Sequence, residues 1–195
     1  RQQEKAALVV RFNGGSQAAH NVITPDGRHH TFAQFGSGSF LPTVQTYLSR
    51  FMLLDPFALA NEARGLIKLG CTDPFQRLSV DSEAKVITPF QKAANRLREA
   101  LRSRRHGSCG MGIGETMADS LASPPLSVIA AHLPQPQRLI RELRDIQEVK
   151  YQEFKQRFHE LTREDHIALQ GEIEVLSDRD APRRIAEAMM AIADK

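Results

Sequence analysis

The segment Val9-Val10-Arg11-Phe12-Asn13-Gly14-Gly15-Ser16-Gln17-Ala18-Ala19-His20 joins a short apolar run to a glycine-rich break. The run from Ala7 to Phe12 contains β-branched valines and predicts a buried β-strand. The residues Asn13–Ser16 end that strand sharply, because asparagine and glycine favour turns. The segment therefore predicts a strand that ends in a turn shortly before His20.

Outward from this segment, the chain alternates between strand and helix signals. Residues 21–24 and 28–34 predict two more strands, joined by the turn Thr24-Pro25-Asp26-Gly27. Asp55-Pro56 predicts the start of a helix that ends at Gly70, because aspartate favours the N-cap and proline the first helical position. Residues 77–80 and 84–87 predict short strands.

The second half of the chain is mainly helical in pattern. We expect a basic helix from Phe90 to Arg104, a short helix near Thr116–Leu121 and a long amphipathic helix from Gln137 to Leu161. The proline-rich residues 122–136 predict a linker, and a last helix begins at Asp180. The pattern indicates an α/β fold, with an α/β nucleotide-site portion over 1–121 and a mainly helical portion of the same domain over 122–195.

Composition sets the class of protein. The chain has 195 residues, of which 41% are hydrophobic and 25% charged, as in ordinary soluble globular proteins. No apolar run is long enough to span a bilayer, so we expect no membrane partner. A net charge of +3 leans mildly toward anionic partners such as nucleotides. Only two cysteines are present, which favours a reducing, cytoplasmic location without disulfides.

Three ordered segments resemble one known family. Val9–Val22 resembles the V-V-R-[FY]-x-G-G-x-N-A-G-H-T-[VL] segment of adenylosuccinate synthetases. Residues 78–99 resemble the family's strand, proline–aromatic turn and following helix. Gly107-Ser108-Cys109-Gly110-Met111-Gly112-Ile113-Gly114 resembles G-T-T-G-R-G-I-G. Short glycine strings are common by chance, so the specificity lies in the order and spacing of the three segments.

The resemblance implies a fold and an activity. The fold would be a partial, P-loop-related adenylosuccinate synthetase-like one, with a central sheet fragment and a helical subdomain. The family is a ligase of purine nucleotide biosynthesis: it transfers phosphate from GTP to the 6-oxygen of IMP, and L-aspartate then displaces that phosphate. The resemblance also implies Mg²⁺ and a homodimer in the cytoplasm.

The resemblance also implies roles for single residues. His20 falls on the histidine that acts as an acid on the oxygen being phosphorylated, which suits an imidazole because it titrates near neutrality. Gln17 falls on an IMP-binding asparagine, and Ala19 on a glycine whose backbone carbonyl reaches the magnesium ion. The IMP phosphate is implied at Ser108, Cys109 and Gly110. Independently of the resemblance, successive amides in a glycine-rich turn can form an anion-binding concavity.

Several positions depart from the family pattern. Gln17 is longer than the family's asparagine, Ala19 and Asn21 replace a glycine and a threonine, and Cys109 replaces a threonine. A thiol is a weaker hydrogen-bond donor than a hydroxyl. Further replaced positions are Ala33 for a histidine, Met111 for an arginine, and Ser123 for the arginine that a partner subunit lends.

Two larger parts of the family pattern are not found. Nothing in Arg1–Ala6 resembles the phosphate loop with its aspartate and lysine, and the carboxy-terminal half would follow residue 195. Because the first residue is arginine, we expect a fragment or a processed product. The chain alone is expected not to turn over.

Alternatives remain open at this stage. The chain could be a non-catalytic, nucleotide-binding or regulatory relative, which Cys109, Met111 and the missing loops favour. It could be a nucleic-acid binder that uses the Arg96–Arg105 helix, which ranks last because the net charge is small. His20 could be a buried, hydrogen-bonded histidine, and Cys109 a small core residue. His29 and His30 should face opposite sides of a strand, as a solvated turn flank.

Overall fold

The computed structural model describes residues 6–17, 19–102, 107–122 and 125–195. Their contacts form two compact units: unit 1 (residues 1–86, 129–131 and 191–195) and unit 2 (residues 87–128 and 132–190). The first boundary between these units falls after residue 86, whereas the sequence predicts that the mainly helical portion begins after residue 121. The portions 1–121 and 122–195 remain a prediction about domain organisation.

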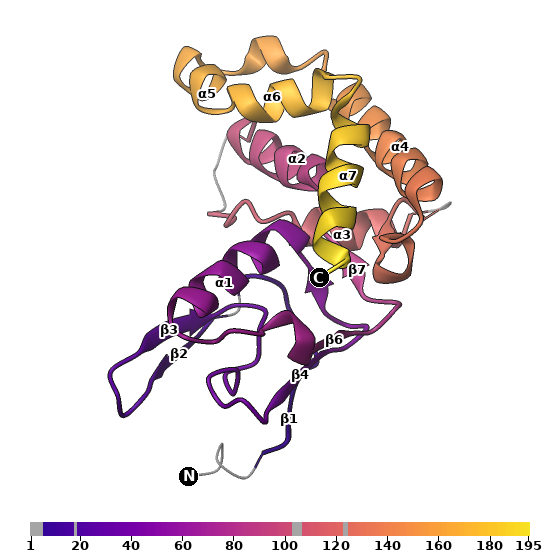
Figure 1. The fold of residues 1–195 in the computed structure, drawn as a ribbon. Coiled ribbons are helices and arrows are strands. Elements are labelled where there is room, and N and C mark those ends of the chain that lie inside the picture. Colours follow the sequence, from indigo (N-terminus) through magenta and orange to yellow (C-terminus); the bar gives the residue numbers. More distant parts are fainter. Residues whose placement is uncertain (1–5, 18, 103–106, 123–124) are drawn as a thin grey trace. The chain divides into compact units, whose positions relative to one another are not determined.

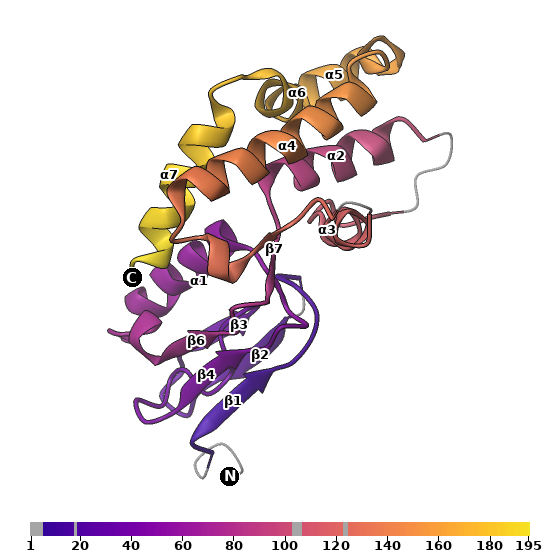
Figure 2. The ribbon, with the colours of Figure 1, turned by 90° about the vertical axis from the view of Figure 1, so that its right-hand side faces the viewer.

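Unit 1 contains a three-stranded parallel sheet in the order β1-β4-β6 (Figure 2). Its strands are β1 (Leu8–Arg11), β4 (Gln45–Leu48) and β6 (Leu78–Val80). The parallel register places Leu8 opposite Gln45, and Thr46 of the central strand opposite Leu78. The predictions for β1 and β6 are confirmed, but the sequence interpretation does not include β4.

The prediction that the first strand is buried is wrong for one of its faces. Leu8 and Val10 are 49% and 48% exposed, and Phe12 beyond the strand is 65% exposed. Side chains alternate between the two faces of a strand, so Leu8 and Val10 share one face while Arg11 is on the other and is buried. The valines therefore predict the strand correctly, but they do not show that one of its faces is exposed to solvent.

A hairpin and a helix complete the part of unit 1 that matters for the site. β2 (His20–Ile23) and β3 (His29–Phe32) pair antiparallel, and Gly27 has a φ of 86° in the turn between them. Helix α1 (Pro56–Lys68) starts as predicted, because the side chain of Asp55 accepts the Ala58 N–H at 3.1 Å. α1 lies against β3 (Figure 1).

The proline-rich segment 122–136 is more than a linker. It contains β8 (Val128–Ile129) and a 3₁₀ turn over Ala130–His132. β5 (Leu53–Leu54) and β7 (Lys85–Val86) of unit 1 pair in parallel, and the strand order of their sheet is β5-β7-β8. The Ala130 N–H continues this pairing by donating to the carbonyl of Ala84 at 2.9 Å.

Unit 2 is helical. The basic helix is α2 (Pro89–Ala100), and a capping box of Thr88 and Gln91 fixes its start. α2 packs against α3 (Ile113–Ser120), α4 (Pro136–Phe154) and α6 (Gln170–Ser177). The predicted long helix ends at Phe154, earlier than the expected Leu161. Two more helices are α5 (Arg163–Ala168) and α7 (Ala181–Ala193), the latter as predicted.

The core of unit 2 forms where these helices meet. Burial is complete for apolar side chains that face inward from α2 and α4, which explains the amphipathic spacing in the sequence. These side chains are Phe90, Leu97, Leu139, Leu143, Ile146 and Phe154.

Candidate functional site

The first candidate site is a hollow of about 340 Å³ in unit 1. The last residues of β1, the two residues that follow it, His20 and Ser37 form its lining. It therefore lies at the carboxyl end of a parallel strand, which is where α/β sheets place their ligands. The lining residues are Val9, Val10, Arg11, Phe12, Asn13, His20 and Ser37.

The candidate residues of the first motif are accessible. His20 is exposed, so the alternative of a buried, hydrogen-bonded histidine is wrong. Gln17 and Ala19 are exposed as well, although neither lines the hollow. The structure therefore brings His20 together with Ser37 and the end of β1, and leaves Gln17 and Ala19 beside that group on the same chain segment.

Arg11 places a positive charge in the wall of this hollow. The residue is 7% exposed, and its guanidinium donates to the carbonyl of Ala33 at 2.8 Å. Burial lowers the pKa of Arg11, and the carboxylate of Glu62 acts in the opposite direction. The buried guanidinium still carries its charge, because the ordinary pKa of arginine is far above neutral pH.

The loop after β3 leads to Ser37 in the wall of the hollow, and a carboxylate of helix α1 holds this loop. The carboxylate of Glu62 accepts the N–H groups of Ala33, Gln34 and Phe35. The side chain of Gln34 in turn exchanges two hydrogen bonds with the backbone of Asp55, at 2.9 and 2.8 Å. Ala33 stands at the position of the family histidine, and its backbone N–H and carbonyl help to hold the loop through hydrogen bonds to Glu62 and Arg11.

The second candidate site is the glycine-rich loop of unit 2. Gly107, Gly110 and Gly112 all have positive φ values, so these positions favour glycine. A side-chain amide from α2 holds the loop: Asn95 donates to Ser108 Oγ at 2.9 Å and accepts the Gly112 N–H at 3.2 Å. Ser108, Cys109 and Gly110 therefore lie together on one constrained turn.

Part of the loop's anion-binding capacity is already used by the protein. The Gly107 N–H donates to a carboxylate oxygen of Glu99 at 2.8 Å, and the Gly110 N–H donates to Ser108 Oγ at 3.2 Å. Ser108 and Cys109 are exposed. The expectation of a buried, structural Cys109 is wrong, because the turn carries its side chain outward rather than into the helical core.

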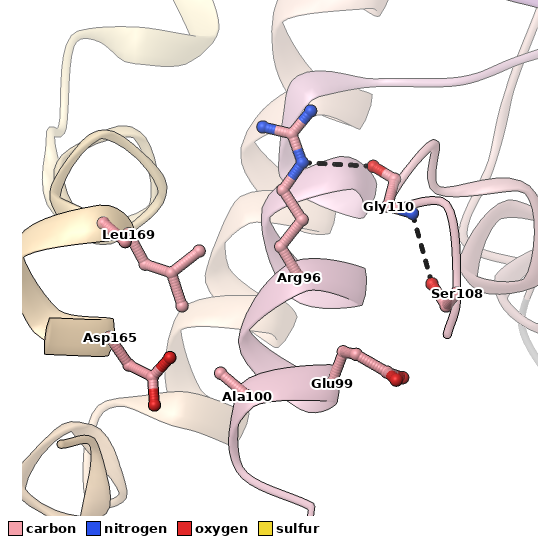
Figure 3. A pocket seen from close by; sticks show the side chains of 8 residues that line it. Arg96, Glu99, Ala100, Ser108, Gly110, Asp165 and Leu169 are labelled. Carbon is pink, nitrogen blue, oxygen red and sulfur yellow. Dashed lines mark hydrogen bonds between the residues drawn. The ribbon is translucent and has the colours of Figure 1, made fainter. Parts of the chain in front are cut away.

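A second hollow, of about 250 Å³, opens beside this loop (Figure 3). Arg96 lines the hollow, and its Nε donates to the Gly110 carbonyl at 3.2 Å. The carboxylates of Glu99 and Asp165 also line the hollow. Ser108 and Gly110 of the loop line the hollow as well, so its wall combines one positive and two negative side chains with the predicted phosphate turn.

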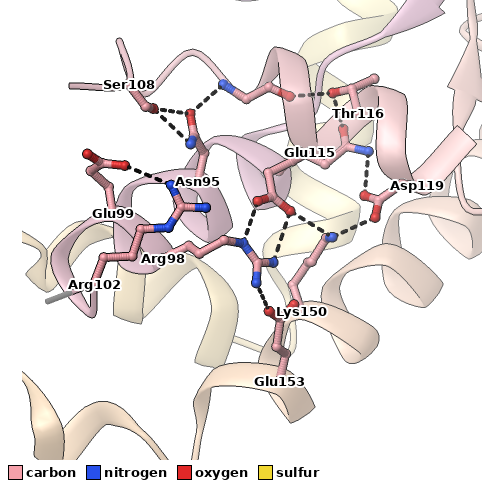
Figure 4. A network of polar contacts seen from close by, with 12 residues as sticks. Asn95, Arg98, Glu99, Arg102, Ser108, Glu115, Thr116, Asp119, Lys150 and Glu153 are labelled. Atoms are coloured by element: carbon pink, nitrogen blue, oxygen red, sulfur yellow. Dashed lines mark hydrogen bonds and ion pairs between the residues drawn. The ribbon is translucent and has the colours of Figure 1, made fainter. Parts of the chain in front are cut away.

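Behind the loop, unit 2 contains a buried cluster of charges (Figure 4). Lys150 of α4 donates to Asp119 at 2.6 Å and to Glu115 at 3.2 Å, both on α3. Arg98 of α2 pairs with Glu115 at 2.7 Å and also with Glu153. Burial alone raises the pKa of Glu115, but Arg98 and Lys150 outweigh it, and the net pKa is lowered. The cluster ties α3, which begins at the end of the loop, to α2 and α4.

The basic helix carries less free charge than its sequence indicates. Arg96 pairs with Glu172, Arg98 with Glu115 and Arg102 with Glu99. Each of these arginines therefore has a carboxylate partner within unit 2, which reduces the charge available to a nucleic acid. Arg104, Arg105 and His106, and also Ser123, lie outside the described residues.

The described part of the chain contains neither a cluster of metal-ligating side chains nor a helix fit to span a membrane. Among residues 6–17, 19–102, 107–122 and 125–195, no group of three or more His, Cys, Asp or Glu side chains could hold a metal ion. Mg²⁺ commonly takes few protein ligands and completes its shell with water and nucleotide phosphates. Ala19 is exposed, and its backbone carbonyl could supply one such protein ligand. In the same part of the chain, no helix combines the length and apolar character needed to cross a membrane.

Comparison with known proteins identifies the family. The family model for adenylosuccinate synthetase matches residues 2–189. The chain belongs to the adenylosuccinate synthetase family. This assignment confirms the resemblance carried by the three ordered segments, and it places the chain in a family of ligases of purine nucleotide biosynthesis.

Similar adenylosuccinate synthetases include those of Mycobacterium tuberculosis and Saccharopolyspora erythraea. The enzyme of Mycobacterium tuberculosis (strain H37Rv) is 29% identical over 145 residues, which cover 74% of this chain and 33% of that protein. The enzyme of Saccharopolyspora erythraea is 32% identical over 120 residues, which cover 61% of this chain and 28% of that protein. The chain thus spans about a third of the length of the curated relatives it matches.

A solved structure supports the fold. The fully ligated adenylosuccinate synthetase of Plasmodium falciparum matches with a TM-score of 0.69 at 14% identity, over 93% of this chain and 41% of that one. The predicted α/β, adenylosuccinate synthetase-like partial fold is therefore confirmed.

Sequence reasoning missed residues that hold the two candidate sites. Glu62 and Glu99 are single acidic residues on helices, and nothing in their spacing shows which backbone amides they receive. Asn95 lies within the second family segment, residues 78–99. Its position on α2 one turn after the capping box was the available signal for a contact with the nearby glycine-rich loop.

Proposed function

We propose that this chain forms the nucleotide-site portion of an adenylosuccinate synthetase-type ligase, which joins IMP or a related purine nucleotide to L-aspartate with GTP and Mg²⁺. The observation that carries the proposal is the hollow at the carboxyl end of β1, because it gathers an exposed His20, Arg11 and Ser37 in one place. The intact protein would act as a cytoplasmic homodimer, as the family resemblance implies.

The purine part of the proposal concerns unit 1. His20 would donate a proton to the 6-oxygen as negative charge develops there, for which an exposed imidazole is suited. Gln17 would contact the nucleotide from the same segment, and its extra methylene compared with asparagine would shift that contact outward. Ala19 would offer its carbonyl to Mg²⁺, which when bound would neutralise charge on the transferred phosphate.

The phosphate part of the proposal concerns unit 2. Ser108 Oγ and the exposed backbone at Cys109 would receive the phosphate of the nucleotide, with Gly110 shaping the turn. The positive φ at Gly110 turns the chain sharply at this point. The weaker donor Cys109 makes Ser108 the side chain on which most of this contact would depend.

Calorimetry with the 195-residue chain tests nucleotide binding. We expect IMP to bind, inosine to bind more weakly because it lacks the phosphate, and His20→Ala to weaken both. His29→Ala is the matched control, because His29 is also exposed, on the partner strand of the hairpin, outside the hollow. No binding of IMP at millimolar concentration would refute the proposal.

Ligation itself needs a separate assay. Adenylosuccinate formation from IMP, GTP, Mg²⁺ and aspartate should require a polypeptide that supplies the phosphate loop and the carboxy-terminal half. Restoring these parts without any His20-dependent product would contradict the ligase assignment while leaving nucleotide binding intact.

A second candidate is a nucleotide-binding relative without ligase activity. The specific observation is that Glu99 occupies the amide of Gly107, so that a carboxylate stands at the loop proposed for phosphate. Met111, in place of the family's arginine, removes a positive charge from the same loop. This candidate predicts IMP binding that depends on Ser108, unchanged by His20→Ala, with no product under any conditions.

A further inference from the structure

Glu62 receives three consecutive backbone amides inside unit 1. The N–H groups of Ala33, Gln34 and Phe35 donate to its two carboxylate oxygens at 2.9, 2.7 and 3.2 Å. The Glu62 side chain is only 6% exposed, so water competes little for these bonds. Three successive amides that converge on one anion form a concavity of the kind that binds phosphates, here filled by the protein's own carboxylate.

The segment that Glu62 holds leads directly into the wall of the His20 hollow. The Gly36 N–H donates to Thr46 Oγ1 at 3.1 Å, and a Cβ added at Gly36 would lie 2.8 Å from the Cβ of Val9. The backbone therefore packs tightly on the sheet at this point, and Ser37 follows as a lining residue of the hollow. A displacement of residues 33–35 would move Ser37 relative to His20.

Charged and titratable groups face Glu62 from the neighbouring strands. Arg11 of β1 donates to the Ala33 carbonyl at 2.8 Å, and His30 Nε2 of β3 lies 3.7 Å from Glu62 Oε1, beyond hydrogen-bond distance. Asp55, at the start of α1, bonds to Gln34 through its backbone. Burial raises the pKa of Glu62, while the three amides and Arg11 oppose that rise.

We infer that Glu62 is a positioning residue for the nucleotide hollow: its carboxylate holds residues 33–35, and these residues set the position of Ser37, which lines the hollow together with His20. Glu62 does not line the hollow itself, so it acts through the loop and not on the ligand. The inference rests on the proposed function only for the identity of the ligand, because the position of the wall is a property of the chain alone.

The substitution Glu62→Gln tests the inference with little change of shape. A glutamine offers one acceptor oxygen and turns an NH₂ group toward N–H donors. Amide hydrogen exchange at Ala33, Gln34 and Phe35, followed by NMR, should become about tenfold faster, as expected for the loss of hydrogen bonds to a charged acceptor. Glu83→Gln is the matched control, since Glu83 is an exposed carboxylate of unit 1 and should leave these amides unchanged. Unchanged exchange in Glu62→Gln would overturn the inference.

The affinity of Glu62→Gln for IMP gives a second readout, because electrostatics alone and a displaced wall predict changes of opposite sign. Removing a carboxylate near Arg11 would by itself strengthen the binding of an anionic nucleotide. If the wall is misplaced, IMP should instead bind about tenfold more weakly, since small displacements of a positioned group are costly. Equal or tighter binding would overturn the inference. If the wild-type chain binds no IMP, the proposed function fails, whereas amide exchange still decides the role of Glu62.

A titration of the unmodified chain covers the case in which Glu62→Gln does not fold. The amide resonances of residues 33–35 should shift together as the pH is lowered, with one shared midpoint above the ordinary pKa of glutamate, 4.5. The Ser37 amide should follow the same midpoint. Absent or unrelated titrations of these resonances would overturn the inference.

Discussion

The two candidate loops are held in place by different physical means. In unit 1, the Ala33–Gly38 loop is fixed by a buried carboxylate that accepts three amides. In unit 2, the Gly107–Gly112 loop is fixed mainly by a neutral amide, Asn95, and by glycines with left-handed backbone conformations. The charged side chains of Glu99 and Arg96 each add one hydrogen bond, to the Gly107 N–H and the Gly110 carbonyl. The first loop should therefore respond to pH, whereas the second should respond to side-chain volume and to the helices behind it.

The largest expected effect concerns the support behind the second loop. Lys150→Met would leave the buried carboxylate of Asp119 without its cation, whereas Glu115 would keep Arg98, and the loss should destabilise the protein by about 3–5 kcal/mol. Urea unfolding, followed by circular dichroism of this helical unit, would measure the loss. Lys155→Met, an exposed position on the same stretch of chain, should cost little. A similar result for both variants would mean that the buried cluster does not support α3.

The next effect tests whether the second loop depends on glycine geometry. Gly112 has a φ of 76°, and an added Cβ would lie 3.0 Å from the backbone nitrogen of Lys92. Gly112→Ala should therefore destabilise the protein by about 1–3 kcal/mol.

Gly114→Ala provides the matched control for Gly112→Ala. Gly114 lies two residues later in α3, and its Cβ would meet nothing within 4 Å. Alanine is the better helix former, so this variant should be neutral or slightly stabilising. Comparing the melting temperatures of the two variants separates backbone geometry from the mere presence of a methyl group. Equal effects would contradict the account of the loop.

The sequence predicts where each loop lies in the chain better than it predicts which side chains hold the loop in place. The turn residues Gly36–Gly38 and Gly107–Gly112 stand out as breaks, and Asp55-Pro56 marks the start of α1. The central strand β4 was missed because Gln45-Thr46-Tyr47 carries little of the apolar signal that marks β1. The partners Glu62 and Asn95 lie 27 to 29 and 13 to 17 residues from the groups they bind, and such pairings depend on tertiary packing.

A smaller expected effect concerns His30, whose titration adds to the pH dependence of unit 1. His30 packs edge-on against Phe32, and its Nε2 is buried without a hydrogen-bond partner among the described residues. Burial, and then the neighbouring His29, lower the pKa of His30 from its ordinary 6.5. The folded state thus favours the neutral ring, so stability should decrease as the pH falls below 6.5 toward the lowered value.

Glu62 acts with the opposite sign in the acid range. Because the pKa of Glu62 is raised, the folded state binds this proton more tightly than the unfolded state does. The contribution of Glu62 to the stability of the protein therefore decreases as the pH rises from 4.5 through the raised pKa. His30→Gln should remove the loss of melting temperature below pH 6.5 and leave the Glu62 contribution. The exposed His29→Gln should only reduce that loss, because His29 is the smaller of the two causes that lower the pKa of His30. An unaltered pH profile in His30→Gln would show that the histidine does not contribute to it.

The smallest expected effect concerns the anion capacity of the second loop. The carboxylate of Glu99 occupies the Gly107 N–H at 2.8 Å and places negative charge beside the proposed phosphate position. Glu99→Gln would remove that charge, and the affinity for IMP or inorganic phosphate should rise by about threefold at low salt and by less at high salt. Glu164→Gln, an exposed carboxylate in the first turn of α5, is the control. Weaker binding after Glu99→Gln would instead make this carboxylate a structural part of the phosphate turn, and the second loop would then depend on a charge just as the first one does.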